Sequence, residues 1–376
     1  MKVFKCLLLC SLLFIGGCGK KANVCKFEAP RRRVVSFLGV GDNLIHESIY
    51  TSNKQDDGSY DFSSIYENIL DDIQNSDIAF INQETPIAGK ELGLGGYPMF
   101  NTPIEMVDNL HDAGFNLINL ASNHSLDRYE SGIRNELQAF SKYEDMITDG
   151  VYTSQSDFDT IPVFKKNGIT FSFLAYTYGT NGISSNYSYS VSYFDENQIR
   201  EDVKNAKEIS DVVIVSAHWG EENSLTPSSM QKRYAQLFAD LEVDVVIGTH
   251  PHVIQPIEWV KGKTGNETLV VYSLGNFIGG MLSVNNAISG MVQFDFVKEN
   301  GEITVENVKW EPLFIHFERC GENFVDDRHN YKSYKLSEYT EELARKHALN
   351  EYGGQTVSID YIHKITNQVI DSQYME

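Results

Sequence analysis

The sequence predicts an α/β domain that spans residues 34–318. Short apolar runs alternate with helix-like segments, as in a sheet whose faces are covered by helices. Strand-like pairs joined by glycine-containing turns add antiparallel strands to this pattern. The 376 residues are 41% hydrophobic and 12% aromatic, which is enough apolar material for a large core and excludes a wholly disordered chain.

The expected elements follow one another in a regular order along the chain. The strand-like runs span residues 34–40, 77–81, 115–120, 212–217 and 243–247. The helix-like segments that come before the last four of these runs span residues 64–74, 103–113, 196–209 and 228–241. The hairpin-like pairs are 163–165 with 170–175, 255–261 with 268–273, and 290–297 with 303–310. Residues 319–376 are expected to form a helical appendage packed on the domain, with helix-like segments at 336–349 and 358–371.

The N-terminus has the pattern of a bacterial lipoprotein signal. Two lysines precede an apolar run at residues 6–15, and Gly16 and Gly17 come directly before Cys18. A membrane-spanning helix needs about 20 apolar residues, so this run is too short to be one. We therefore expect a signal peptide ending at Gly17, a lipid on Cys18, a tether over residues 18–33, and a protein anchored at the extracytoplasmic face of the cell membrane. The alternative is an ordinary secretory signal in which the cysteine occurs by chance.

The charge of the chain restricts its partners. There are 31 basic and 52 acidic residues, for a formal net charge of −21. Nucleic acids and anionic membrane surfaces are bound by clustered lysine and arginine, so we expect no nucleic-acid partner. Beyond the signal and Cys18, the sequence holds Cys25 and Cys320, which could pair outside the cytoplasm; the sequence leaves this open.

Side chains that can bind metal follow five of the expected strands, at the sheet edge where α/β folds bind ligands. They are Asp42 with His46, Glu84, Asn123 with His124 and Asp127, His218, and His250 with His252. Each has an ordinary explanation when taken alone, such as a turn cap, a loop carboxylate or a packed histidine. Two histidines two residues apart in extended backbone project to the same side, and Pro251 favours extended geometry at His250, so this pair gives the strongest signal. Mixed carboxylate and imidazole ligands suit Mn, Fe or Zn, and six or seven of them fit two ions that share one carboxylate.

At these residues the sequence resembles the poly-γ-glutamate capsule synthesis protein CapA family, which is similar to a branch of the calcineurin-like metallophosphoesterases. The matching motifs are Gly41-Asp42, Asn82-x-Glu84, Asn123-His124-x-x-Asp127, His218-Trp219-Gly220-x-Glu222, Gly248-x-His250-Pro251-His252-x-x-Gln255 and Ser273-Leu274-Gly275-Asn276-Phe277. The resemblance covers residues 34–318 and implies a four-layer α/β/β/α sandwich.

The resemblance also implies a role for each of these residues. Asp42 and His252 would bind one ion, Asn123, His218 and His250 would bind the other, and Glu84 would bind both. His124 would be the proton donor, and Asp127 would orient it. Glu222 and Asn276 are further site candidates. The sequence departs from the superfamily pattern at two positions. Leu44 stands where a ligand histidine is usual, so His46 is an alternative ligand, and the bridging acid is a glutamate instead of an aspartate.

Two functions from different classes follow. The first is a surface lipoprotein that uses two divalent ions to hydrolyse a phosphoester or related acyl bond in cell-surface polymer metabolism. The second is a non-hydrolytic accessory protein that serves poly-γ-glutamate synthesis, export or anchoring within a polymer-producing complex. A site that binds no metal and serves only as a scaffold is a third possibility.

Overall fold

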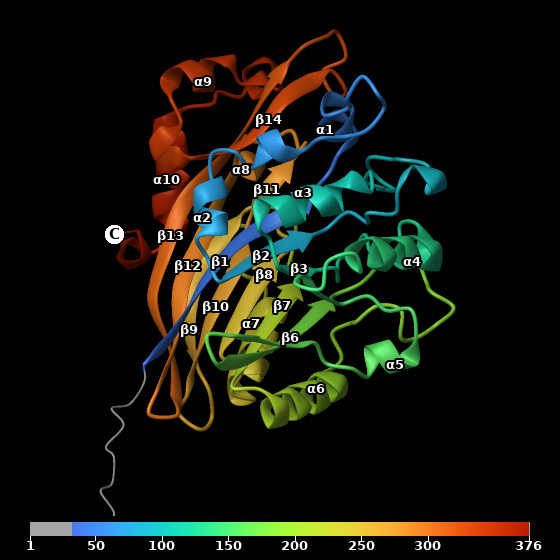
Figure 1. Ribbon diagram of the computed structural model, residues 1–376. Helices are drawn as coiled ribbons and strands as arrows, with labels where there is room; N and C mark the ends of the chain where they lie inside the picture. The colour runs from blue at the N-terminus through green and yellow to red at the C-terminus, as the bar shows by residue number, and fades with distance from the viewer. Residues whose placement is uncertain (1–31, 376) are drawn as a thin grey trace, which may run out of the picture. The chain divides into compact units, whose positions relative to one another are not determined.

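A computed structural model describes residues 32–375, which form one compact unit (Figure 1). The expected signal peptide, Cys18, Cys25 and nearly all of the tether lie outside the described residues. Within residues 32–375, none of the helices has the length and apolarity that a membrane crossing requires. Cys320 is exposed to solvent.

The first sheet combines parallel and antiparallel strands. Its order is β14-β13-β12-β1-β2-β3-β4, and β11 pairs with β1 from outside this path. The strands β11, β1, β2, β3 and β4 are parallel, whereas β12, β13 and β14 are antiparallel neighbours. The bounds are β1 (Arg33–Leu44), β2 (Ile78–Gln83), β3 (Leu117–Asn119), β4 (Ile147–Asp149), β11 (Asn276–Gly279), β12 (Ile288–Glu299), β13 (Glu302–Arg319) and β14 (Arg328–Lys335).

The second sheet has a parallel centre and antiparallel edges. Its order is β5-β6-β7-β8-β10-β9, in which β6, β7, β8 and β10 are parallel. The bounds are β5 (Val163–Lys166), β6 (Ile169–Thr177), β7 (Val212–His218), β8 (Val245–Thr249), β9 (Ile254–Lys261) and β10 (Glu267–Leu274).

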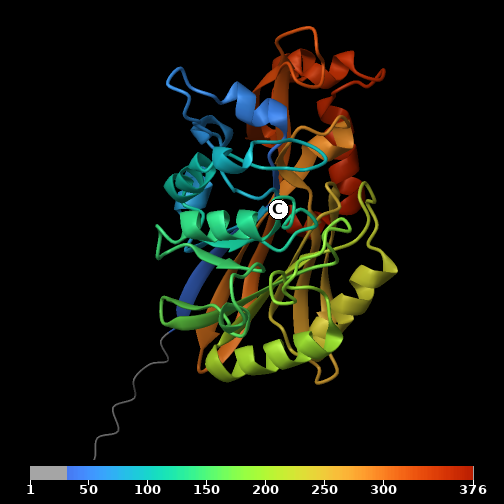
Figure 2. The ribbon, with the colours of Figure 1, turned by 90° about the vertical axis from the view of Figure 1, so that its right-hand side faces the viewer.

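Helices cover the outer faces of both sheets, so the prediction of a four-layer α/β/β/α sandwich is confirmed (Figure 2). On the second sheet, α6 (Glu196–Ile209) and α7 (Ser229–Asp240) bury Val203 and Phe238 against strand residues such as Val215. On the first sheet the outer layer includes α3 (Glu105–Ala113) and α4 (Tyr129–Phe140). The other helices are α1 (Glu47–Ser52), α2 (Leu70–Gln74), α5 (Gln155–Phe158), α8 (Val284–Ala287), α9 (Glu341–Lys346) and α10 (Ile359–Val369).

Three expectations about helical segments need correction. Residues 64–74 do not form one helix, because a 3₁₀ turn at Ser63–Ile65 is separated from α2. The stretch 336–349 is likewise divided into a 3₁₀ turn, α9 and a second 3₁₀ turn. The segment 319–376 is also more than helices, because its strand β14 pairs with β13 and extends the first sheet.

Candidate metal centre

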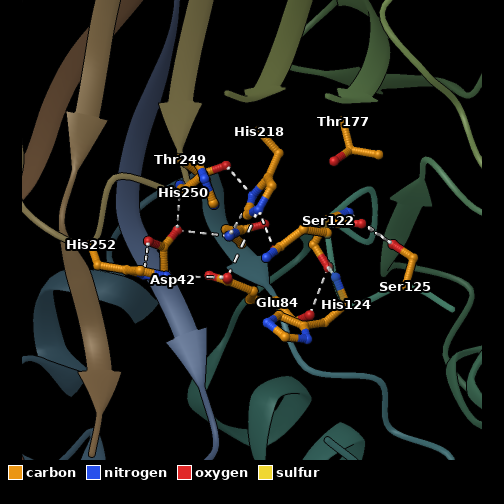
Figure 3. Close-up of polar contacts among 12 residues, drawn as sticks. Asp42, Glu84, Ser122, His124, Ser125, Thr177, His218, Thr249, His250 and His252 are labelled. Atoms are coloured by element: carbon orange, nitrogen blue, oxygen red, sulfur yellow. Dashed lines mark hydrogen bonds and ion pairs between the residues drawn. The ribbon is translucent and has the colours of Figure 1, made fainter. Parts of the chain in front are cut away.

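The candidate site lies where the carboxyl ends of strands from both sheets meet. Asp42 is near the end of β1, Glu84 directly follows β2, and His218 ends β7. The loop after β8 carries His250 and His252. Figure 3 shows these side chains converging on one another from opposite sheets. The site is therefore built by the topology, because parallel strands end at a common edge.

The ligand atoms of five predicted residues form two overlapping groups. One group joins Glu84, His250 and His252, and the other joins Asp42, Glu84 and His218. Within each group the ligand atoms lie within 4.8 Å of one another, and all five residues are buried. Glu84 belongs to both groups, as a bridging carboxylate would. The groups divide the other ligands differently from the expected partition, which paired Asp42 with His252 and His218 with His250.

Glu84 lacks the hydrogen bonds that a buried carboxylate requires. Only 1% of the residue is exposed, and neither carboxylate oxygen has a hydrogen-bond partner among the described residues. Its Oε1 lies 3.5 Å from His252 Nε2 and 3.8 Å from His218 Nε2. Burial raises the pKa of Glu84. A buried carboxylate that accepts no hydrogen bond is costly, and a cation between these atoms would reduce that cost.

His252 directs one ring nitrogen toward Glu84 because the other is already engaged. Its Nδ1 lies 3.1 Å from Asp42 Oδ2 and 2.9 Å from Asn276 Oδ1, which are both acceptors. Nδ1 therefore carries the hydrogen, and the Nε2 of a neutral ring presents a lone pair to Glu84. Burial by itself lowers the pKa of His252, but the carboxylates of Glu84 and Asp42 outweigh it and raise the pKa to about 10. The carboxylates around His252 thus favour a positive charge at this position, and either a proton on the ring or a bound metal ion would supply it.

His218 and His250 are suited to bind a cation as neutral rings. Burial lowers the pKa of each of them, and the neighbouring histidines add to the effect. His218 places Nε2 at 3.0 Å from Asn123 Oδ1 and Nδ1 at 3.0 Å from Thr249 Oγ1. His250 Nδ1 is buried without a hydrogen-bond partner among the described residues. The carboxylate and imidazole set therefore fits divalent transition metals.

The expected extended backbone at the two histidines is wrong. β8 ends at Thr249, and the φ angles of His250 and His252 are +96° and +57°. Residues other than glycine rarely adopt these angles, and such strain is typical of functional sites. The chain has to turn sharply there, and the His250 amide donates to Asp42 Oδ1 at 3.3 Å. The two rings meet through this turn, with their centres 5.7 Å apart.

His124 and Asp127 form the expected pair beside the cluster. His124 Nδ1 lies 2.7 Å from Asp127 Oδ2, and both side chains are buried. The Phe100 amide also donates to Asp127 Oδ2 at 2.7 Å, and the Phe100 ring packs edge-on against His124, with the ring centres 4.7 Å apart. Asp127 therefore fixes the imidazole orientation and leaves Nε2 for another partner.

The remaining candidates take different places. Asn276 is buried and orients His252, as described above. His46 is not in either ligand group, and its Nδ1 accepts the Gly280 amide at 3.0 Å. Glu222 is exposed, yet its charge contributes to raising the pKa of Glu84, after burial and the charge of Asp42.

Three contributors to the site had no role predicted from the sequence, although Asn82 belongs to one of the matching motifs. Asn82 donates to Asp42 Oδ1 at 2.7 Å, and Thr249 contacts His218. The half-exposed ring of Tyr178 lies beside His250, with the ring centres 4.6 Å apart. Tyr178 directly follows β6, so the strand-end pattern could have indicated it. The glycine turn before that strand, however, indicates a hairpin arm and gives no sign of a ligand at its end.

The chain is similar to known proteins of bacterial capsule synthesis. A family model described as bacterial capsule synthesis protein PGA_cap matches residues 36–281. The chain is 28% identical over 306 residues to PGA biosynthesis protein CapA of Bacillus subtilis (strain 168), which covers 79% of this chain and 76% of that protein. It is also 28% identical over 210 residues to capsule biosynthesis protein CapA of Bacillus anthracis, covering 54% of this chain and 49% of that protein.

Likenesses to solved structures are more distant. A phosphatase from Mycoplasma pneumoniae gives a TM-score of 0.48 at 14% identity, covering 75% of this chain and 94% of that chain. A 5′-nucleotidase of Staphylococcus aureus gives 0.45 at 16% identity, covering 74% of this chain and 54% of that chain.

Proposed function

The chain belongs to the bacterial capsule synthesis protein family PGA_cap, and from this premise we propose that it is a metal-dependent hydrolase. Its reaction would be the cleavage of a phosphoester or related acyl bond in the metabolism of a capsule polymer. The cofactors would be two divalent ions, of Mn, Fe or Zn, that share the Glu84 carboxylate.

The observation that carries the proposal is the surroundings of Glu84. A carboxylate with no hydrogen-bond partner, buried between ring nitrogens of His218 and His252, has a ready explanation if cations lie between these atoms. A buried acid with a purely structural role would instead have a hydrogen-bond partner, as Glu136 has in the Ile87 amide at 2.9 Å.

The residues of the cluster would bind the ions, and a neighbouring residue would donate the proton. Divalent ions at this site would activate water and neutralise charge on substrate oxygens. Asp42, Glu84, His218, His250 and His252 would hold the ions, with the Asn123 side-chain oxygen beside His218 as a further ligand.

His124 would act as the general acid. Asp127 accepts the Nδ1 hydrogen, so Nε2 is the atom that can carry a proton to the leaving group. General acid catalysis of this kind contributes about 10²–10⁴-fold in rate.

A non-hydrolytic role in capsule assembly is the second candidate. The matching relatives are described as biosynthesis proteins, which favours a task in making, exporting or anchoring the polymer. In that case the ions would bind polymer carboxylates without cleaving a bond. The substrate or cargo is an anionic polymer or a phosphoester in both proposals, and the protein would work beside the synthesis or export machinery.

Metal analysis joined to a hydrolysis screen distinguishes the candidates. Purified full-length protein should contain up to two divalent ions per chain, and loaded protein should cleave an aryl phosphate or a γ-glutamyl polymer. Metal without cleavage of either substrate class would favour the accessory role. If the protein retains no metal after incubation with Mn, Fe or Zn, the metal site is refuted and a role as a metal-free scaffold remains.

We further propose that the protein is a lipoprotein held at the extracytoplasmic face of the membrane by Cys18. The proposal rests on the short apolar run and the small residues before that cysteine.

A further inference from the structure

Two arginines near the metal centre are more buried than the other arginines of residues 32–375 and lack an acidic partner within that range. Only 2% of Arg328 is exposed, and Arg128 is partly buried, whereas the other arginines of residues 32–375 are exposed. Within that range no carboxylate oxygen lies within 4.0 Å of either guanidinium group. This is notable in a chain with a formal charge of −21, where carboxylates are abundant.

Arg328 is fixed in place while part of its guanidinium group remains available. Its Nε donates to the Val325 carbonyl at 2.9 Å and its Nη1 to the Gly280 carbonyl at 2.8 Å. The group also lies over the rings of Phe317 and Tyr331, at 5.0 and 5.9 Å from their centres. Nη2 donates no hydrogen bond to the described residues. A buried cation that is held firmly but not neutralised is costly unless an anion joins it.

A line of packed groups connects Arg328 to the metal centre. Gly280 lies between Arg328 and His46, because its carbonyl accepts from the arginine and its amide donates to the His46 ring. Phe100 packs edge-on against both His46 and His124, with ring centres 5.2 and 4.7 Å apart. Arg328 is therefore placed on the far side of His46 from the expected proton donor.

Arg128 lies at the opposite end of this line. Its Nη1 donates to the carbonyl of Asp127 at 2.9 Å, and its Nε and Nη2 both donate to the carbonyl of Gly93, at 3.3 and 3.2 Å. These bonds leave one hydrogen on Nη1 and one on Nη2 without a partner among residues 32–375. Asp127 is the residue that orients His124, so Arg128 is next to the expected reacting groups.

We propose that Arg328 and Arg128 form an anion-binding pair that holds carboxylates of an acidic polymer on either side of the His46–Phe100–His124 line. The inference rests on the proposed function, because it takes the polymer and not a small ester as the ligand. The guanidinium hydrogens that remain, on Nη2 of Arg328 and on Nη1 and Nη2 of Arg128, can donate charge-assisted hydrogen bonds to carboxylates, and pre-positioned groups lose little freedom on binding. Arg328 lies beyond the family match at residues 36–281, so the C-terminal segment contributes to recognition.

Binding of a fluorescent γ-linked decaglutamate to the Mn²⁺-loaded full-length protein tests the pair. A hydrogen bond to a charged group contributes about 1.5–3 kcal/mol, so Arg328→Met and Arg128→Met should each raise the Kd about tenfold or more. Arg328→Lys keeps the positive charge but not the planar guanidinium group, so its Kd should lie between the wild-type value and the Kd of Arg328→Met. Arg345→Met is the matched control, because Arg345 is exposed and also has no carboxylate partner, and its Kd should stay within about twofold.

Further measurements distinguish a variant that does not fold from a proposal that is wrong. Thermal unfolding and metal content show whether a variant is folded; if Arg328→Met does not fold, Arg328→Lys and Arg128→Met carry the test. Wild-type affinity in both methionine variants would overturn the proposal, as would stronger competition by inorganic polyphosphate than by unlabelled decaglutamate. Tight, arginine-dependent binding without hydrolysis would support the anion-binding pair while refuting the hydrolase.

Discussion

The bridging role of Glu84 can be measured as a shift in thermal stability on metal binding. A ligand at about 100 times its Kd stabilises the folded state by about 2.7 kcal/mol per site. With an unfolding entropy of about 2.1 cal/mol/K per residue, the 344 residues numbered 32 to 375 give about 0.7 kcal/mol/K. Two Mn²⁺ ions should therefore raise the Tm of the wild-type protein by about 8 °C, which is about 4 °C for each ion.

Two substitutions then separate a bridging ligand from a ligand of one ion. Glu84→Gln should abolish nearly the whole shift, because both ions lose the shared charge. Asp42→Asn should keep roughly half of it, about 4 °C, since Asp42 belongs to one of the two ligand groups. Glu136→Gln, which changes a buried acid outside both groups, should keep the full shift.

Differential scanning calorimetry with and without Mn²⁺ gives the shifts, and elemental analysis of the same samples gives the metal content. If Glu84→Gln and Asp42→Asn lose the same fraction of metal and of the Tm shift, Glu84 does not bridge. If neither substitution changes the shift, the cluster is not the metal site.

Three other predictions follow from the sequence and the structure. His124→Ala should slow hydrolysis of a substrate with a poor leaving group by about 10²–10⁴-fold and hydrolysis of an activated aryl phosphate much less. Its metal content should stay near wild type. Equal slowing of both substrates would argue against His124 as the proton donor. Burial raises the pKa of Glu136 to about 8, so the folded protein holds this proton more tightly than the unfolded chain and loses stability as the pH rises from about 4.5 to 8. Glu136→Gln should remove that loss, so its Tm should exceed that of wild type more at pH 8.5 than at pH 5, and parallel Tm curves against pH would contradict the assignment. Cys18→Ser should move the protein from the membrane fraction to the soluble fraction, and an unchanged partition on fractionation would count against the lipid anchor.

Local patterns in the sequence were sufficient to predict much of the fold and of the site. The helix at 196–209 begins after Asp195, whose side chain accepts the Asn197 and Gln198 amides, and a capping residue of this kind is a local signal. Asp42, Glu84 and His218 can be predicted because each comes at or just after the end of an apolar run, and the order of parallel strands then brings them together.

The features that sequence analysis missed depend on contacts between distant parts of the chain. The strand Arg328–Lys335 is mostly polar and becomes a strand by pairing with β13. The amide of Phe100 reaches Asp127 across 27 positions, and no local pattern indicates that bond. The positive φ angles of His250 and His252 likewise arise where a loop between strands has to bring both rings to the carboxylates.

The pairing of β14 with β13 also affects how this protein can be shortened for laboratory work. β13 contains a continuous buried stretch that includes Leu313, Ile315 and Phe317, and β14 pairs along that part of its edge. A chain cut at residue 318, the end of the domain expected from the sequence, would expose this apolar edge with its backbone groups unpaired. Open edges of this kind recruit strands from other molecules, so the shortened protein should aggregate more during expression than a protein that keeps its C-terminal segment.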